Sequence, residues 1–132
     1  MVMGMQVQTR DTRNKADEEA GKKQKKADLK KNISGLEDRL DLLQQEYRIK
    51  QIEKTDAVHC YARKRKIIEE MQAEKNNQTI KKVSELLMEY VTGENYRKLC
   101  MCYDEALRTI GEEIYRVQQQ LEENRAQLNK LR

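Results

Sequence analysis

The sequence predicts an all-α protein, an antiparallel helical hairpin or coiled coil with a short helix in the turn region. The chain of 132 residues has no Pro, Phe or Trp and only five Gly, a composition that suits long uninterrupted helices and lacks the large aromatic residues of a globular core. From Tyr96 to Leu131, apolar residues recur in alternating steps of four and three. This pattern lasts for about five heptads and is typical of a coiled-coil helix. Because a single helix would leave this stripe in water, we expect a facing helix.

The N-terminal tail, residues 1–28, shows no hydrophobic periodicity. Its composition leaves two interpretations open, a disordered tail or a fraying helical extension. Residues 1–32 carry nine Lys or Arg and five Asp or Glu, so they contain the whole net charge of +4. The tract KKQKKADLKK at 22–31 is either a patch for nucleic acid, anionic lipid or an acidic partner, or a solubilising tail. Since no aromatic residue is interleaved for base stacking, nucleic acid is the less expected partner.

A long helix is expected over residues 29–75. Its apolar stripe contains Leu29, Ile33, Leu36, Leu40, Leu43 and Tyr47. Beyond Tyr47 the same frame meets Lys50 and Lys54 before apolar residues return, which indicates a contact face that rotates or meets more than one partner. The basic run RKRK at 63–66 is interpreted as a solvated face, balanced by glutamates at helical spacing.

A short amphipathic helix is expected over residues 80–91, with Thr79 as its N-cap. Its heptad series contains Ile80, Val83, Leu87 and Tyr90. Two breaks flank it, and the hairpin turn is expected at one of them. A turn at Asn76–Thr79 gives arms of nearly equal length. The second break, Val91, Thr92 and Gly93, resets the heptad frame, and we select these three residues as the turn.

A second long helix is expected over residues 94–131, with Thr92 as its cap and Glu94 at its positive end. Asn124 is the one polar member of its stripe, and such a residue can determine register or oligomeric state. The side chains expected to form the hairpin seam or to bind a partner are Leu36, Leu40, Leu43, Tyr47, Tyr96, Tyr103, Leu107, Ile110, Ile114, Val117 and Leu121.

Other apolar residues lie off the seam, and a two-helix hairpin has no place to bury them. They are Ile49, Ile52, Val58, Leu99 and Met101. Apolar residues left on the outside of a hairpin indicate that further helices, from a partner or from a second copy, complete the structure.

The sequence shows no catalytic apparatus, so we expect a protein that is not an enzyme and that uses no cofactor or metal. His59 next to Cys60, and Cys100-x-Cys102, are the candidates for a zinc site. Residues of a Cys-x-Cys on a helix point to nearly opposite sides, which favours structural thiols. An odd number of cysteines favours a reducing compartment, and no stretch predicts a signal peptide or membrane span, so we expect a cytoplasmic protein.

A family resemblance starts at the second break. It rests on the segment Val91-Thr92-Gly93-Glu94-Asn95-Tyr96 and on the later residues Leu99, Tyr103, Leu107, Ile110 and Ile114. These resemble the WXG family of type VII secretion, and most of all the helical accessory proteins associated with LXG toxins, although Val91 stands where that family has Trp. The resemblance implies an adaptor or targeting chaperone inside the cell. Its partner would be a toxin N-terminal domain or a sister accessory protein.

Three alternatives remain open. The segments around Gln8–Lys15 and Tyr90–Leu107 also resemble small coiled-coil chaperones of type III secretion filament proteins. Without either resemblance, the pattern is that of a structural homo-oligomeric coiled coil, or of a nucleic-acid binder that uses its basic tail. Each of these classes works through helix–helix association or through the charge of the N-terminal tract.

Overall fold

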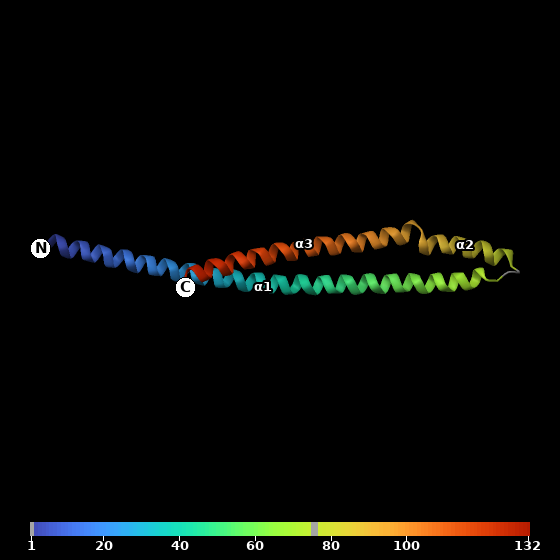
Figure 1. Cartoon of the computed structure of the whole chain (residues 1–132), viewed down its shortest axis with the longest axis horizontal. Helices are drawn as coiled ribbons and strands as arrows, with labels where there is room; N and C mark the ends of the chain where they lie inside the picture. The colour runs from blue at the N-terminus through green and yellow to red at the C-terminus, as the bar shows by residue number, and fades with distance from the viewer. Residues whose placement is uncertain (1, 75–76) are drawn as a thin grey trace. The chain divides into compact units, whose positions relative to one another are not determined.

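A computed structural model describes residues 2–74 and 77–132, with side chains from residue 13 onward. It contains three helices, α1 (Val2–Gln72), α2 (Gln78–Thr92) and α3 (Glu94–Lys130), and the described residues form no strand. Helix α1 is paired with the arm formed by α2 and α3 (Figure 1). The predicted all-α helical hairpin is therefore confirmed. Over the described ranges, no helix is both long enough and apolar enough to cross a membrane.

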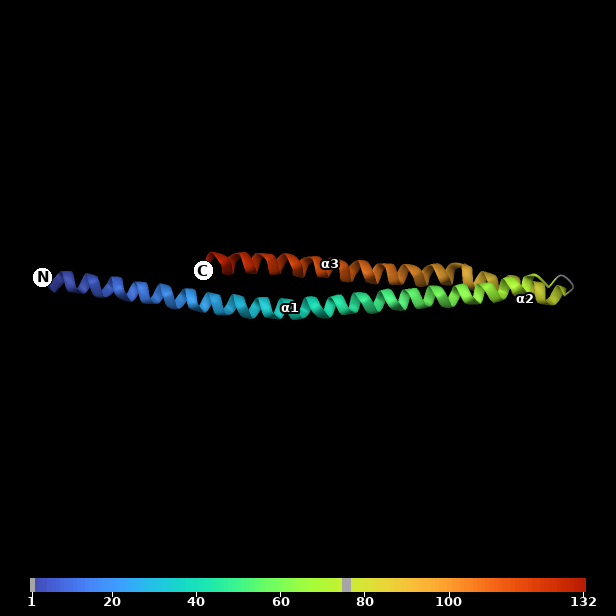
Figure 2. The same ribbon diagram turned by 60° about the horizontal axis from the view of Figure 1, so that its bottom comes forward.

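The helices form two compact units. The turn unit, Leu42–Ile114, contains the second part of α1, all of α2 and the first part of α3. Within it the chain reverses after α1, and α2 and α3 return along α1 in the opposite direction (Figures 1 and 2). Its buried apolar residues are Ile68 and Val91, and Ser84 of α2 is also fully buried.

The terminal unit comprises residues up to Asp41 and from Tyr115 to Arg132. In this unit the end of α3 lies antiparallel to α1, and the N-terminal part of α1 continues past the end of α3 (Figure 1). Val117, Leu121 and Leu128 are its buried apolar residues. Residues 13–25 of α1 are exposed, so the helix there is held by its own backbone and not by a facing helix.

Helix α1 starts at Val2 and not near Leu29, where the apolar stripe begins. Periodicity reports only the part of a helix that is packed, whereas Lys, Glu, Gln and Ala form helix by intrinsic propensity. The extension also has local support, because Gln24 Nε2 donates to Asp28 Oδ1 over 3.1 Å, one helical turn away. Of the two possibilities for residues 13–28, the structure has the helical extension.

The hairpin turn lies between α1 and α2. Helix α1 ends where the amide of Ala73 is shared between the carbonyls of Glu69 and Glu70, at 3.2 and 3.3 Å. Asn77 has extended backbone and caps α2, since its Oδ1 accepts from the amides of Thr79 and Ile80. The expected cap at Thr79 is therefore wrong, because Asn77 already satisfies these amides and α2 begins at Gln78. Asn76, the first residue of the expected break, lies outside the described residues.

Val91, Thr92 and Gly93 form a bend between α2 and α3 instead of the hairpin turn. Thr92 ends α2, and its Oγ1 donates to the carbonyl of Met88 over 2.7 Å, so it is not the cap expected for α3. The amide of Gly93 donates to the carbonyl of Glu89 over 2.8 Å. A Cβ at Gly93 would overlap that carbonyl oxygen and lie 2.7 Å from Glu89 Oε1. The bend therefore requires glycine for space, since its φ of −85° is open to any residue.

Two glycine substitutions test this account. Gly93→Ala should destabilise the protein by about 1–3 kcal/mol, because the new methyl group has to displace the Glu89 backbone. Gly35→Ala should stabilise it by about 0.5–1 kcal/mol, because Gly35 is inside a helix with no atom near its Cβ position. Urea unfolding followed by far-ultraviolet circular dichroism measures both. A shift of the two midpoints in the same direction would contradict the bend as described.

Candidate helix-binding surface

The seam of the terminal unit is its best-buried part. Val117 and Leu121 are at most 2% exposed, and Leu128 is also buried. Burying each of these side chains contributes about 1.5–3 kcal/mol. The α1 side of this seam is half-buried and consists of Leu29, Ile33, Leu36 and Leu40. The apolar stripes of α1 and α3 thus lie on the facing sides of the two helices.

Two polar contacts lie at or beside the terminal seam. Arg125 Nη2 lies 3.1 Å from Glu37 Oε1, and both side chains are about half exposed. An exposed pair of this kind contributes at most about 1 kcal/mol, but it connects α1 to α3 in one register. Asn124 donates from Nδ2 to the carbonyl of Gln120 over 2.7 Å. It therefore bonds to its own helix, and the structure shows no bond from it to α1.

Aromatic residues connect the two arms of the turn unit. The rings of Tyr61 and Tyr96 have centroids 5.1 Å apart at 53°, a tilted contact between α1 and α3. Such pairs contribute about 0.5–1.5 kcal/mol beyond the area they bury. Tyr47 covers Gly111, where a Cβ would lie 3.9 Å from its ring. The Lys64 ammonium lies 5.5 Å from the Tyr61 ring, which places one member of the basic run over an aromatic face.

A charged pair sits between these aromatic contacts. Lys54 Nζ donates to Asp104 Oδ1, and this hydrogen bond raises the pKa of Lys54 above its ordinary value. Lys54 stands at a heptad position of α1 where the apolar stripe has a charged residue. Its partner on α3 is the carboxylate of Asp104. Nearby, a hydrogen bond with Cys100 raises the pKa of Tyr96, and loss of hydration acts in the same direction.

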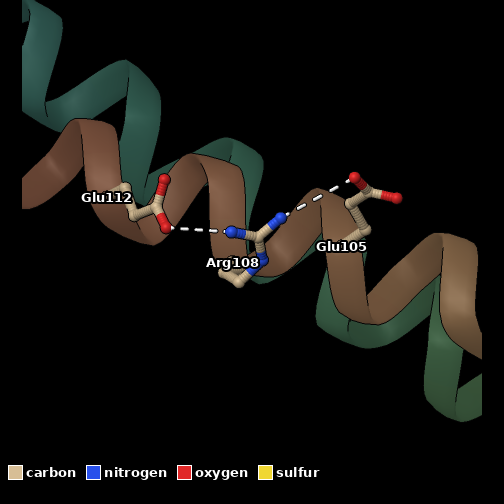
Figure 3. A network of polar contacts seen from close by, with 3 residues as sticks. All are labelled: Glu105, Arg108 and Glu112. Carbon is tan, nitrogen blue, oxygen red and sulfur yellow. Dashed lines mark hydrogen bonds and ion pairs between the residues drawn. The ribbon is translucent and has the colours of Figure 1, made fainter.

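The outer side of α3 is charged. Figure 3 shows Arg108 between two glutamates of its own helix, with Nη1 3.1 Å from Glu112 Oε1 and Nη2 3.7 Å from Glu105 Oε1. Lys98 and Glu94 form a similar pair at 3.3 Å, one turn apart. These pairs support the helix by a few tenths of a kcal/mol each, on the order of 0.2–0.5. They also mark this side of α3 as a solvated surface.

The candidate zinc residues do not come together. Cys60 and Cys100 are half-buried, Cys102 is exposed, and all three are free thiols. His59 is exposed. Within residues 13–74 and 77–132, no three side chains of His, Cys, Asp or Glu are grouped as metal ligands would be. The two thiols of the Cys-x-Cys pair thus differ in exposure, with Cys100 half-buried and Cys102 exposed.

All eleven residues expected in the seam are buried or half-buried. In the terminal unit, Val117 and Leu121 are buried and Leu36 and Leu40 are half-buried. In the turn unit, the half-buried members are Leu43, Tyr47, Tyr96, Tyr103, Leu107, Ile110 and Ile114. A partner therefore has to contact other residues unless the hairpin opens.

A second set of apolar residues in the turn unit is exposed. We call this set the apolar face, and it consists of Leu42, Ile49 and Ile67 on α1 and Val83, Leu86, Leu87 and Tyr90 on α2. Leu86 is the most exposed, at 74%. So many exposed large apolar side chains in one small unit are unusual on a surface that has no partner.

The two halves of the apolar face point to the same side of the turn unit. Ile67 directly precedes buried Ile68 on α1, and Val83 and Tyr90 directly precede buried Ser84 and Val91 on α2. In an antiparallel pair, a two-fold axis perpendicular to the plane of the helix axes relates the two helices. Rotation about this axis exchanges the two helices but does not exchange the two sides of the plane. Residues that directly precede a seam residue therefore lie on the same side of the plane in both helices.

Of the residues expected outside the seam, Ile49, Ile52 and Met101 are exposed, whereas Val58 and Leu99 are half-buried. Sequence reasoning missed Leu42, Ile67 and Leu86 as exposed apolar residues. Leu86 has a signal in the sequence, because Val83, Leu86, Leu87 and Tyr90 follow the i, i+3, i+4, i+7 spacing of one helix face. That spacing does not reveal which face of α2 meets α1.

Comparison with known proteins does not identify a relative: no family model matches the chain, and neither a curated protein nor a solved structure is significantly similar to it. Functional inference therefore depends on the geometry of the two units.

Replacing Ile110 and Ile114 by Asp should lower helicity and unfold the turn unit, because both side chains are half-buried between α1 and α3. The matched control is Met101→Asp, which places the same charge on an exposed position of the same helix. Circular dichroism and thermal melting compare the variants. If the double variant melts like the control, our assignment of the seam is incorrect.

Proposed function

We propose that this protein is a non-enzymatic helical adaptor or targeting chaperone that binds a helix of a partner protein on the apolar face of its turn unit. The observation that carries this proposal is the group of exposed aliphatic residues on α1 and α2. A two-helix unit buries one stripe of each helix, and here each helix has a second stripe on the same side. An added helix would cover the part of this face at Leu42 and Ile49.

The expected partner is an amphipathic helix. Leu42 and Ile49 are two turns apart on α1. A partner helix that runs along α1 would contact both of these side chains. Such a helix binds through anchors at positions i, i+3, i+4 and i+7 and is unstable alone in water. Binding would therefore hold the partner helix in a folded form and cover its apolar side.

The class of client comes from the resemblance to accessory proteins of LXG toxins. By that resemblance, the partner is the helical N-terminal domain of a toxin or a sister accessory protein, and delivery to type VII secretion is the outcome. The three free thiols fit a reducing compartment, and we place this activity in the cytoplasm. The same surface would serve a type III filament chaperone, whose client is also a helix that otherwise self-associates.

The client test uses co-expression with the proteins encoded beside this chain. The full chain should co-purify with one of them as a complex of defined mass. Ile49→Asp should weaken this complex about tenfold or more without loss of helicity, because it places a carboxylate in the apolar face. Light scattering after gel filtration measures the complex.

The control for this test is Met101→Asp, an exposed position that follows a seam residue and so faces away from the apolar face. It should bind the client as the natural chain does. Equal binding by both variants would contradict the proposed surface, and the lack of any stable complex would contradict the proposed function.

A second candidate, binding of an acidic partner such as nucleic acid, is favoured by one observation. The tract at 22–31 is helical, most of its lysines are exposed, and the helix before it has no facing helix over residues 13–25. Six lysines on such a helix present their charges at helical spacing. The lysines that carry this charge are Lys22, Lys23, Lys25, Lys26, Lys30 and Lys31.

This candidate predicts a steep dependence on salt. Affinity for a short duplex DNA should fall by about 10³ or more between low and physiological salt if six lysines displace counterions. Deletion of residues 1–25 should lower the affinity at fixed salt. Fluorescence anisotropy titrations measure both. Binding that does not change with salt or with the deletion would remove this candidate and leave the adaptor proposal in place.

A further inference from the structure

Helix α2 has four large apolar side chains that are exposed. Val83, Leu86, Leu87 and Tyr90 are between 40% and 74% exposed, and they form one continuous stripe with i, i+3, i+4 and i+7 spacing. Ser84 and Val91 are the buried side chains of α2, and Ile80 and Met88 on the same side of the helix are half-buried. The exposed stripe is thus a second apolar stripe, outside the packed side of α2.

The stripe has one positive and one negative residue beside it, at opposite ends. Lys82 directly precedes Val83, and Glu89 directly precedes Tyr90, so the two charges lie on the same flank and seven residues apart. Lys82 is at the N-terminal end of the stripe and Glu89 at the C-terminal end. Both are exposed, and neither forms an ion pair with another residue of the described ranges.

We propose that the α2 stripe binds the α2 stripe of a second copy of this chain, in antiparallel orientation around a two-fold axis near Leu86 and Leu87. This names one partner of the proposed helix-binding surface and rests on that proposal. In this arrangement Val83 packs against Tyr90 of the second copy. The pairing is self-complementary, as a two-fold interface has to be.

Charge selects the antiparallel orientation. Residues that directly precede a stripe residue lie on one flank of the stripe. When two such helices pack antiparallel, this flank of one helix faces the same flank of the other. Lys82 then meets Glu89 of the second copy, and the two-fold axis repeats the contact, so each dimer has two ion pairs. A parallel pairing would place Lys82 beside the apolar Leu87 and leave both charges without a partner.

The size of the surface requires a contribution from α1. Seven residues of helix span about 10 Å, which is a small interface when stable dimers bury about 1,200–2,000 Å². Ile67 and Tyr90 directly precede buried Ile68 and Val91 on the two arms of the turn unit. Ile67 is exposed on the same side and extends the stripe in both copies. We expect a dimer of micromolar affinity.

The dimer leaves part of the apolar face open. Leu42 and Ile49 lie well along α1 from Ile67, by 25 and 18 residues. They remain available for a client helix when α2 is paired. Self-association and client binding therefore use different parts of the same face, and they can be tested separately.

The test is a charge exchange across the two-fold axis in the full chain. Sedimentation equilibrium should show a concentration-dependent change from the 15.7 kDa chain to twice that mass. Lys82→Glu or Glu89→Lys alone should weaken the dimer about tenfold or more, since each creates two like-charge contacts. An equimolar mixture of the two variants should form a heterodimer, and the double variant K82E/E89K should recover the homodimer. Lys81→Glu, an equal charge change on the adjacent position, should have little effect.

Three results would each overturn the proposal. One is a protein that stays monomeric up to about 200 µM, well above a micromolar dissociation constant. The second is a Lys81→Glu variant that weakens the dimer as much as Lys82→Glu, and the third is a variant mixture that fails to form a heterodimer. A monomer that still binds its client removes only this inference, whereas a dimer that binds no client removes only the proposed adaptor function.

Discussion

Each seam side chain in this protein is covered by one facing helix, and the rest of the structure follows from that constraint. In a globular core a leucine is surrounded by several elements, whereas here its outer edge stays in water. This is why most seam residues are half-buried and only a few, such as Val117 and Leu121, are fully buried. The same constraint leaves a second side on every helix. In the turn unit that side is apolar on α1 and on α2.

A heptad stripe alone does not determine a register, because a shift of seven residues restores the same pattern. Specific side-chain contacts that occur at only one place along the pair break this degeneracy. Lys54 with Asp104, and Tyr61 with Tyr96, do so in the turn unit. Glu37 with Arg125 does so in the terminal unit. These contacts contribute little to stability individually, but a shifted register would separate each pair and leave the half-buried Lys54 without its carboxylate.

Much of the fold is contained in residue spacing. The four-and-three steps from Tyr96 onward, and the stripe from Leu29 to Tyr47, are enough to predict two long helices and their pairing. Residue spacing reveals a helix only where one side of it is packed. The start of α1 at Val2 therefore has to be predicted from the helix propensity of its residues. Spacing also does not separate two adjacent capping candidates. Asn77 and Thr79 are both good caps, and the backbone conformation of Asn77 decides between them. The apolar face was visible as a pattern on α2, but only the burial of Ser84 and Val91 shows that the pattern points outward.

The bend at Gly93 separates the phase of α2 from that of α3. Along α2, Ser84 and Val91 are buried, and each directly follows an exposed residue. Substitutions at the exposed positions therefore alter the outer surface of α2 without touching the side chains that keep the helix on α1. The chemistry of this surface and the stability of the hairpin are set by separate residues.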